Sequence, residues 1–201
     1  MNGQDILTAT RGTYLKCASY RDAGDTVSVI IHDGPQPRRR TTSHPFSTWF
    51  LRPNRFRFEV AARTIGASIE WLRYVVWERE DATRAWCSLN GEQEAGDVSR
   101  HLAGTVGFSG MPAERVPCLL MPARFEQGGA PGVVAEGIES VGDVLCHKLS
   151  LAWPAVDIGI VRPATWWVGT QDFLIRREFN VLELGGERGK TNACAGNAIA
   201  A

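Results

Sequence analysis

The sequence has no excess of charge of either sign and no long apolar run. Its 201 residues include 22 basic and 22 acidic side chains, and its one basic run is Arg38, Arg39 and Arg40. A chain without net charge has no long-range field that would attract a phosphate backbone, so we expect no nucleic acid partner. No stretch reaches the roughly 20 apolar residues that a membrane-spanning helix needs, so we expect a soluble protein.

The first residues lack the features of a secretory leader. Residues 1–5 read MNGQD, which is neither a basic segment nor an apolar one. The sequence alone therefore leaves two alternatives open, a cytoplasmic protein or a protein whose leader has been removed.

Metal, cofactor and redox motifs are also missing. The five cysteines are scattered without a CxxC pair, and the four histidines are far apart. No HExxH, Walker or GxGxxG motif is present, so we expect neither a metal nor a cofactor. We interpret most of the cysteines as core residues. If the chain works in an oxidising compartment, Cys118 and Cys146 are the pair that we would expect to form a disulfide.

The sequence is rich in aromatic residues and in alternating segments. Seven Trp and eight Phe supply enough apolar surface for one folded domain. Residues 55–60 read RFRFEV and alternate charged with apolar side chains, as a strand does when one face meets water and the other a core. Similar patterns predict about nine strands, over 20–31, 46–51, 55–60, 68–78, 83–89, 133–141, 144–152, 165–169 and 173–182.

Helical spacing occurs in three places, over 4–18, 93–106 and 113–120. Because these helices occur in blocks beside consecutive antiparallel strands, the expected fold class is α+β. We expect a curved antiparallel sheet with an N-terminal helix and an inserted helical lid. A single domain is expected over 1–184, and residues 185–201, which lack periodicity, are expected to form a disordered tail.

The concave face of such a sheet must be filled by the helices. Complete filling would give a packed domain, whereas loose filling would leave an apolar cavity under a lid. Tryptophans on the predicted strands favour the cavity, although each of them suits a packed core as well. These tryptophans are Trp49, Trp71, Trp77, Trp86, Trp166 and Trp167. Alternation and helical spacing predict that the cavity is lined by Phe46, Phe50, Phe56, Phe58, Val60, Leu102, Leu119 and Leu120.

Residues 50–59, FLRPNRFRFE, resemble the strand, Arg-Pro, strand signature of the outer-membrane lipoprotein carrier (LolA-like) family. Weaker similarities follow the family's order, with SYRDAG at 19–24, VPCLLMP at 116–122, and WV at 167–168 before FLIRR at 173–177. The resemblance spans residues 6–179. It implies an incomplete β-barrel whose helix-covered cavity takes lipoprotein acyl chains in the bacterial periplasm.

The same resemblance gives Arg52 the role of a lid latch. Its guanidinium group can reach carbonyl groups at a helix end, although Arg52 can equally be an exposed residue at a strand end. The implied partners are a lipid or an acylated lipoprotein, with membrane-bound donor and acceptor proteins, and we expect a monomer. The chain departs from the family in lacking a leader and, by its pattern, the last strands.

Two other functions compete with a carrier. A regulatory module that senses envelope stress would dock a protein partner through Arg38, Arg39 and Arg40, placed on an exposed hairpin. An enzyme would need a catalytic pair, and the candidates are His32, Asp33 and His44 near one hairpin, or Cys146 beside His147. Adjacent strand residues point to opposite faces of a sheet, so the last pair cannot act together and we predict no enzyme.

Overall fold

The computed structural model describes residues 1–32, 38–63, 71–79, 82–109, 112–125, 131–154, 161–184 and 189–194. Within these ranges the chain forms eleven strands, three α-helices and one short 3-10 helix. All eleven strands belong to one antiparallel sheet in the order β6-β5-β4-β3-β2-β1-β11-β10-β9-β8-β7. The sheet does not close, because β6 and β7 lie at its two edges.

The sheet consists of two meanders joined at its centre. The first contains β1 (Ser19–His32), β2 (Arg38–Leu51), β3 (Arg55–Arg63), β4 (Trp71–Arg79), β5 (Ala82–Cys87) and β6 (Gly91–Ala95). The second contains β7 (Gly132–Val141), β8 (Val144–Pro154), β9 (Val161–Gly169), β10 (Ile175–Leu184) and β11 (Gly189–Cys194). Pairing of β11 with β1 connects the two meanders.

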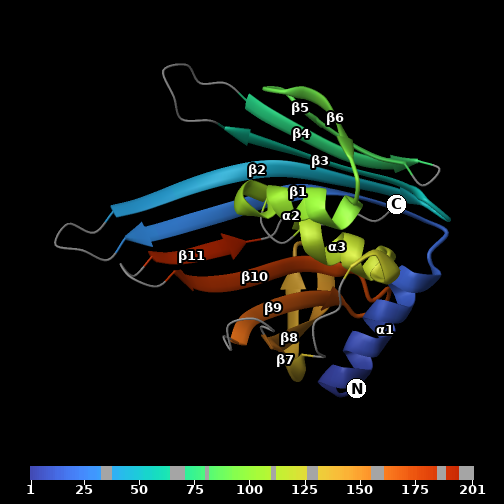
Figure 1. Ribbon diagram of the computed structural model, residues 1–201. Helices are drawn as coiled ribbons and strands as arrows, with labels where there is room; N and C mark the ends of the chain where they lie inside the picture. Colours follow the sequence, from blue (N-terminus) through green and yellow to red (C-terminus); the bar gives the residue numbers. More distant parts are fainter. Residues whose placement is uncertain are drawn as a thin grey trace.

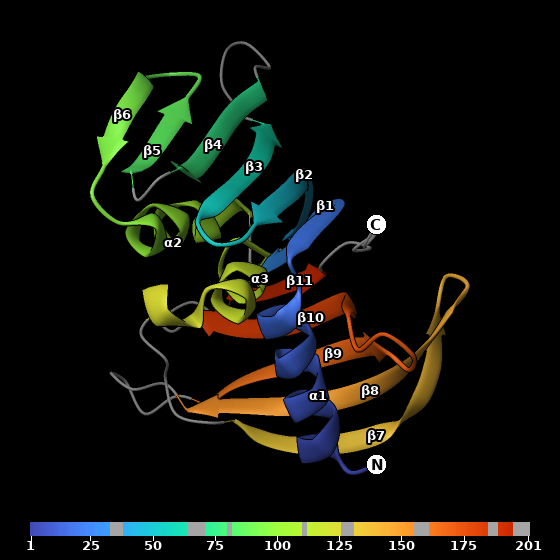
Figure 2. The same cartoon turned by 90° about the vertical axis from the view of Figure 1, so that its right-hand side faces the viewer.

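The helices lie together on the inner side of the curved sheet (Figures 1 and 2). They are α1 (Gly3–Lys16), α2 (Val98–Ser109), α3 (Pro112–Leu120) and the 3-10 helix η1 (Pro122–Arg124). Helix α2 contacts the strands β2 to β5, and α1 contacts β7 and α3. None of the described helices is both long enough and apolar enough to cross a membrane. The expected α+β class and the open sheet are confirmed, because these helices pack on one antiparallel sheet that does not close.

Helix α1 begins at a capping box and packs closely on β7. The Asn2 side chain accepts a hydrogen bond from the Asp5 backbone nitrogen at 2.9 Å, which satisfies one of the free N–H groups of the first turn. Next to this cap, a Cβ atom placed on Gly3 would lie 3.0 Å from the Ala135 nitrogen and 3.1 Å from the Val133 carbonyl oxygen. The backbone of the helix therefore approaches the edge strand so closely that a Cβ atom at this position would force its neighbours to shift by a few tenths of an ångström.

Substitution of Gly3 by alanine should lower the free energy of unfolding by about 1–2 kcal/mol, because the new methyl group must push α1 away from β7. Gly12 provides the matched control in the same helix, since a Cβ atom there would meet nothing within 4 Å. Gly12→Ala should raise stability by about 0.5–1 kcal/mol through helix propensity alone. Urea unfolding of both variants tests this contrast, and equal effects would show that the close contact does not control how α1 docks.

The structure corrects the expected number of strands from nine to eleven. Residues 91–95, part of which was expected to begin a helix, form the edge strand β6, and α2 begins only at Val98. Residues 189–194, expected in a disordered tail, form β11 between β1 and β10. Such a strand is held by backbone hydrogen bonds on both sides, so it needs no alternating side-chain pattern. The expected boundary at 184 thus falls inside the sheet, while 185–188 and 195–201 lie outside the described residues.

Candidate functional site

The inner face of β2 and β3 carries a compact aromatic cluster. The strand register places Phe50 opposite Phe56 and Phe46 opposite Val60. Phe58 lies on the same face because side chains two residues apart share a face, and its ring stacks on Phe46 with centroids 6.2 Å apart. Each of these five side chains is at most 7% exposed. The strand residues predicted to line a cavity are thus brought together on the inner face.

The predicted lid residues meet this cluster from the helices. Leu102 on α2 and Leu120 on α3 belong to it, and Leu119 packs against it. Leu102, Leu120 and Phe58 are each 0% exposed. For these residues the structure shows a packed interior where the sequence favoured an apolar cavity. The leucines of the helices occupy the volume between helices and sheet, and the interior is packed.

Arg52 joins the ends of two helices at the rim of this interior. Its Nε donates to the Cys17 carbonyl oxygen at 2.8 Å, and its Nη2 donates to the Tyr14 carbonyl oxygen at 3.1 Å. Nη2 also donates to the Leu120 carbonyl oxygen at 3.2 Å. Tyr14 and Cys17 belong to the last turn and cap of α1, and Leu120 is the last residue of α3. Arg52 thus supplies donors and positive charge at the helix ends, where the last carbonyl groups have no N–H partner in the next turn.

Two ion pairs also connect α3 and η1 to the sheet. Arg115 of α3 contacts Glu178 of β10 at 3.4 Å, and its guanidinium group lies 4.3 Å from the ring centroid of Trp153. Arg124 of η1 donates to Glu78 of β4 at 2.7 Å. Both glutamates are 3% exposed, and each buried carboxylate receives a charged partner from these helices. Glu178 also accepts a hydrogen bond from Asn180 Nδ2 at 3.0 Å. Polar contacts at the rim therefore surround an apolar centre.

A buried polar group beneath α1 was not predicted from the sequence. Tyr20 donates to the Asp22 carboxylate at 2.8 Å, and the Tyr14 hydroxyl accepts from the Ile175 backbone nitrogen at 3.2 Å. Asp22 is 2% exposed, and burial raises the pKa of its carboxyl group, while the hydrogen bond from Tyr20 acts in the opposite direction. The signal in the sequence was the spacing of Tyr20 and Asp22, which share one face of β1. The Tyr20 ring lies 5.3 Å from the Tyr14 ring between centroids, and this contact connects β1 to α1.

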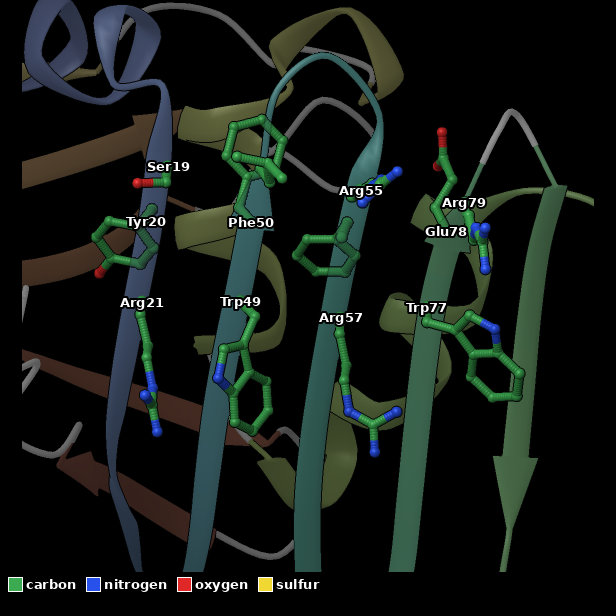
Figure 3. A pocket seen from close by; sticks show the side chains of 12 residues that line it. Ser19, Tyr20, Arg21, Trp49, Phe50, Arg55, Arg57, Trp77, Glu78 and Arg79 are labelled. Carbon is green, nitrogen blue, oxygen red and sulfur yellow. The ribbon is translucent and has the colours of Figure 1, made fainter.

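Most of the tryptophans that favoured a cavity lie on the outer face instead. Trp49 and Trp77 flank Arg57 across β2, β3 and β4, as Figure 3 shows. Their strand neighbours Phe50 and Glu78 are buried on the inner face. Trp86 and Trp167 likewise alternate with buried inner residues. Of the five tryptophans whose side chains are described, Trp166 alone belongs to the core cluster. The side chain of Trp71 lies outside the described residues. Alternation cannot decide which face becomes the core when both faces carry large side chains.

The arginine run does not lie in a hairpin turn. Arg38, Arg39 and Arg40 are the first residues of β2 and pair with His32, Ile31 and Ile30 of β1, while the connecting residues 33–37 lie outside the described ranges. Arg39 and Arg40 are exposed. Consecutive strand residues point to opposite faces, so the side chains of Arg39 and Arg40 lie on different faces of β2. A docking role for this run stays a prediction.

The structure does not bring the candidate pair Cys146 and His147 together. Cys146 and His147 lie on opposite faces of β8, as alternation predicts. Cys146 and Cys118 are both free thiols, which contradicts the expected disulfide. Cys146 lies on the outer face of the sheet, because it shares that face with Lys148, whose ammonium group lies over the outer Trp167 ring. Cys118 belongs to α3 on the inner side. The sheet therefore separates the two cysteines. No three His, Cys, Asp or Glu residues in the described part of the chain are grouped to hold a metal ion.

Comparison with known proteins gives matches among solved structures. No family model matches the chain, and no curated protein matches it significantly. A DUF1329 family protein from Desulfovibrio piger is 12% identical and has a TM-score of 0.43, with 98% of this chain and 92% of that chain covered. A LolA superfamily protein from Nitrosomonas europaea is 12% identical with a TM-score of 0.33, covering 99% and 92%. An outer membrane lipoprotein-sorting protein domain from Vibrio parahaemolyticus is 7% identical with a TM-score of 0.36, covering 98% and 89%.

Proposed function

We propose that this chain is a non-enzymatic carrier that holds a lipid, or the acyl chains of a lipoprotein, against the inner face of its sheet. The observation that supports this proposal is the position of Arg52, which clasps the ends of α1 and α3 at the rim of an apolar interior. A clasp made of hydrogen bonds can open without breaking the core of the sheet. The helices then act as a lid in the way that the resemblance of residues 50–59 implies.

Loading of this carrier is an exchange of apolar partners. In the closed state Leu102 and Leu120 cover Phe58, and an acyl chain would take their place on the aromatic cluster as the helices move outward. Apolar contact is exchanged for apolar contact, so the net change in hydrophobic free energy is small. The rim hydrogen bonds are exchanged for bonds to water, which costs little per bond. A packed interior is therefore compatible with binding when the lid moves.

The proposed setting is the bacterial periplasm, as the family resemblance implies. There a carrier receives its cargo from one membrane-bound protein and delivers it to another. Either partner could open the lid by competing with Arg52 for the carbonyl groups at the ends of α1 and α3. We propose that the carrier acts as a monomer, because a single chain contains both the aromatic cluster and its lid.

Native mass spectrometry of protein purified without detergent, after secretion behind an added leader, should detect a bound lipid or acylated peptide. Leu119→Glu should abolish this binding, because Leu119 packs against the cluster from α3 while remaining partly exposed, so the charge disturbs the lid more than the fold. Leu89→Glu is the matched control, since Leu89 is 67% exposed in the turn between β5 and β6. It should bind lipid as the unmodified chain does.

A ligand-free mass for the unmodified chain, together with no uptake of added fatty acid, would overturn the carrier proposal. The regulatory module would then become the better function, and the packed interior would be simply a core. Equal lipid binding by both leucine variants would also contradict the proposal, because the bound lipid would then lie outside the lid.

A further inference from the structure

A row of arginine and tryptophan side chains crosses the outer face of the first meander. The register aligns Arg21, Trp49, Arg57 and Trp77 on β1, β2, β3 and β4, with Arg84 next on β5. Figure 3 shows the first four of them side by side. Arg21 and Arg57 lie 5.8 Å and 5.9 Å from the ring centroid of Trp49. This row lies on the face of the sheet opposite to the helices.

The row lies in a broad hollow that extends over four strands. The hollow has a volume of about 670 Å³, and Leu51, Arg55 and Arg79 line it beside the row. A second hollow of about 290 Å³ shares Arg57 and Trp77 with the first and reaches Trp86. Leu51 is 45% exposed, so the surface offers an apolar side chain as well as indole rings. Together the two hollows form one continuous outer surface.

The charge of this surface differs from that of the whole chain, which has 22 basic and 22 acidic residues. The larger hollow is lined by four arginines and one carboxylate, Glu78. That carboxylate is 3% exposed and is bound by Arg124 of η1. Within the described part of the chain, Arg21 and Arg55 form no ion pair, and both are exposed. On the same face Glu59 forms ion pairs with Arg57 and Arg73, and Glu92 pairs with Arg84. The arginines of the surface outnumber these carboxylates, so it suits a partner that carries negative charge.

We propose that this outer surface docks on a membrane that contains anionic phospholipids. Guanidinium groups bind phosphate oxygens through paired hydrogen bonds, and each basic residue near an anionic bilayer adds to the attraction. Indole rings prefer the boundary between headgroups and acyl chains, where one edge is wet and the other apolar. Leu51 gives the surface a small anchor for the same boundary.

The arrangement favours a membrane over a single-stranded nucleic acid. The arginines of this surface are spaced in two directions. Along β3, Arg55 and Arg57 are two residues apart, which is about 7 Å. Arg21 and Arg57 lie two strands apart, about 10 Å across the sheet. Such a two-dimensional array of arginines matches the plane of phosphate groups on a bilayer, whereas the phosphate groups of a single nucleic acid strand follow one line. Guanidinium groups also lie over the Trp49 ring, where a base would have to stack.

Cosedimentation with vesicles tests this docking separately from the carrier proposal, because it measures association with intact bilayers and not bound single lipids. The protein should bind vesicles of phosphatidylcholine with phosphatidylglycerol, should not bind phosphatidylcholine alone, and should bind less in high salt. Arg21→Gln/Arg55→Gln should weaken binding about 20-fold, from the loss of two surface charges near the bilayer. On binding, the tryptophan emission should shift to shorter wavelength in the unmodified chain, and less so in Trp77→Ala.

Lys16→Gln/Arg100→Gln is the matched control, because it removes the same charge from exposed positions on α1 and α2. It should bind anionic vesicles as the unmodified chain does. The proposal is overturned if anionic vesicles are not bound, if the two double variants lose binding equally, or if the Arg21/Arg55 variant keeps full binding. Binding of an oligothymidylate strand that depends on Arg21 and Arg55, without vesicle binding, would assign the surface to nucleic acid instead.

Discussion

Phe58→Ala should lower the free energy of unfolding by about 4 kcal/mol, which is a large part of the stability of a domain of this size. Phe58 is 0% exposed at the centre of the cluster that joins β3 to the helices. Its removal loses the transfer free energy of the ring and leaves a cavity between rigid neighbours. Urea unfolding followed by circular dichroism measures the change.

Two companion variants make this result specific to the packed interior. Phe58→Leu keeps most of the apolar volume and should cost roughly 1 kcal/mol. Leu89→Ala removes an apolar side chain that is 67% exposed, so it should change stability by less than about 0.5 kcal/mol. If Phe58→Ala costs no more than Phe58→Leu, the ring must border open space in solution, and a lidded cavity exists in the resting protein after all.

Local alternation determined the part of this interior that the sequence could predict. Residues 55–60 alternate charged and apolar side chains, so Phe56, Phe58 and Val60 had to share a face, and the apolar face had to be the inner one. In β4 both faces carry large apolar residues, so the outward position of Trp77 depended on where the helices pack. The sequence pattern does not contain that information.

Contacts between distant segments account for what the sequence could not predict. Arg115 and Glu178 are separated by 63 residues, and only the fold brings them to 3.4 Å. The strand β11 has no apolar alternation, and its place between β1 and β10 comes from backbone pairing on both sides. The filling of the interior also escaped prediction, because it depends on the fit of α2 and α3 to the sheet and not on any single segment.

Arg52→Leu should release the lid, and it is the variant that separates a latch from an ordinary structural arginine. It removes the hydrogen bonds to Tyr14, Cys17 and Leu120 and leaves their carbonyl oxygens without this donor. Hydrogen bonds to charged groups contribute about 1.5–3 kcal/mol each when they are well shielded from water. Because the Arg52 side chain is only half-buried, we expect the free energy of unfolding to fall by about 3 kcal/mol in total. Thermal unfolding measures this loss.

Hydrogen exchange then shows where the lost stability resides. In Arg52→Leu the amides of the last turns of α1 and α3 should exchange faster, while those of β3 and β8 should keep their protection, because the sheet does not depend on the clasp. Arg55→Leu is the matched control, since Arg55 lies on the same hairpin and is exposed. It should leave exchange in both helices unchanged.

The rate of fatty acid uptake decides the role of Arg52. If the clasp limits opening, Arg52→Leu should take up a fluorescent fatty acid faster than the unmodified chain, with Arg52→Lys in between, because a single ammonium group cannot bridge both helix ends. Faster exchange without faster uptake would make Arg52 a structural cap. Uniformly faster exchange, in the sheet as well as the helices, would show that the lid and the sheet unfold together, and a lid that cannot move alone cannot gate a carrier.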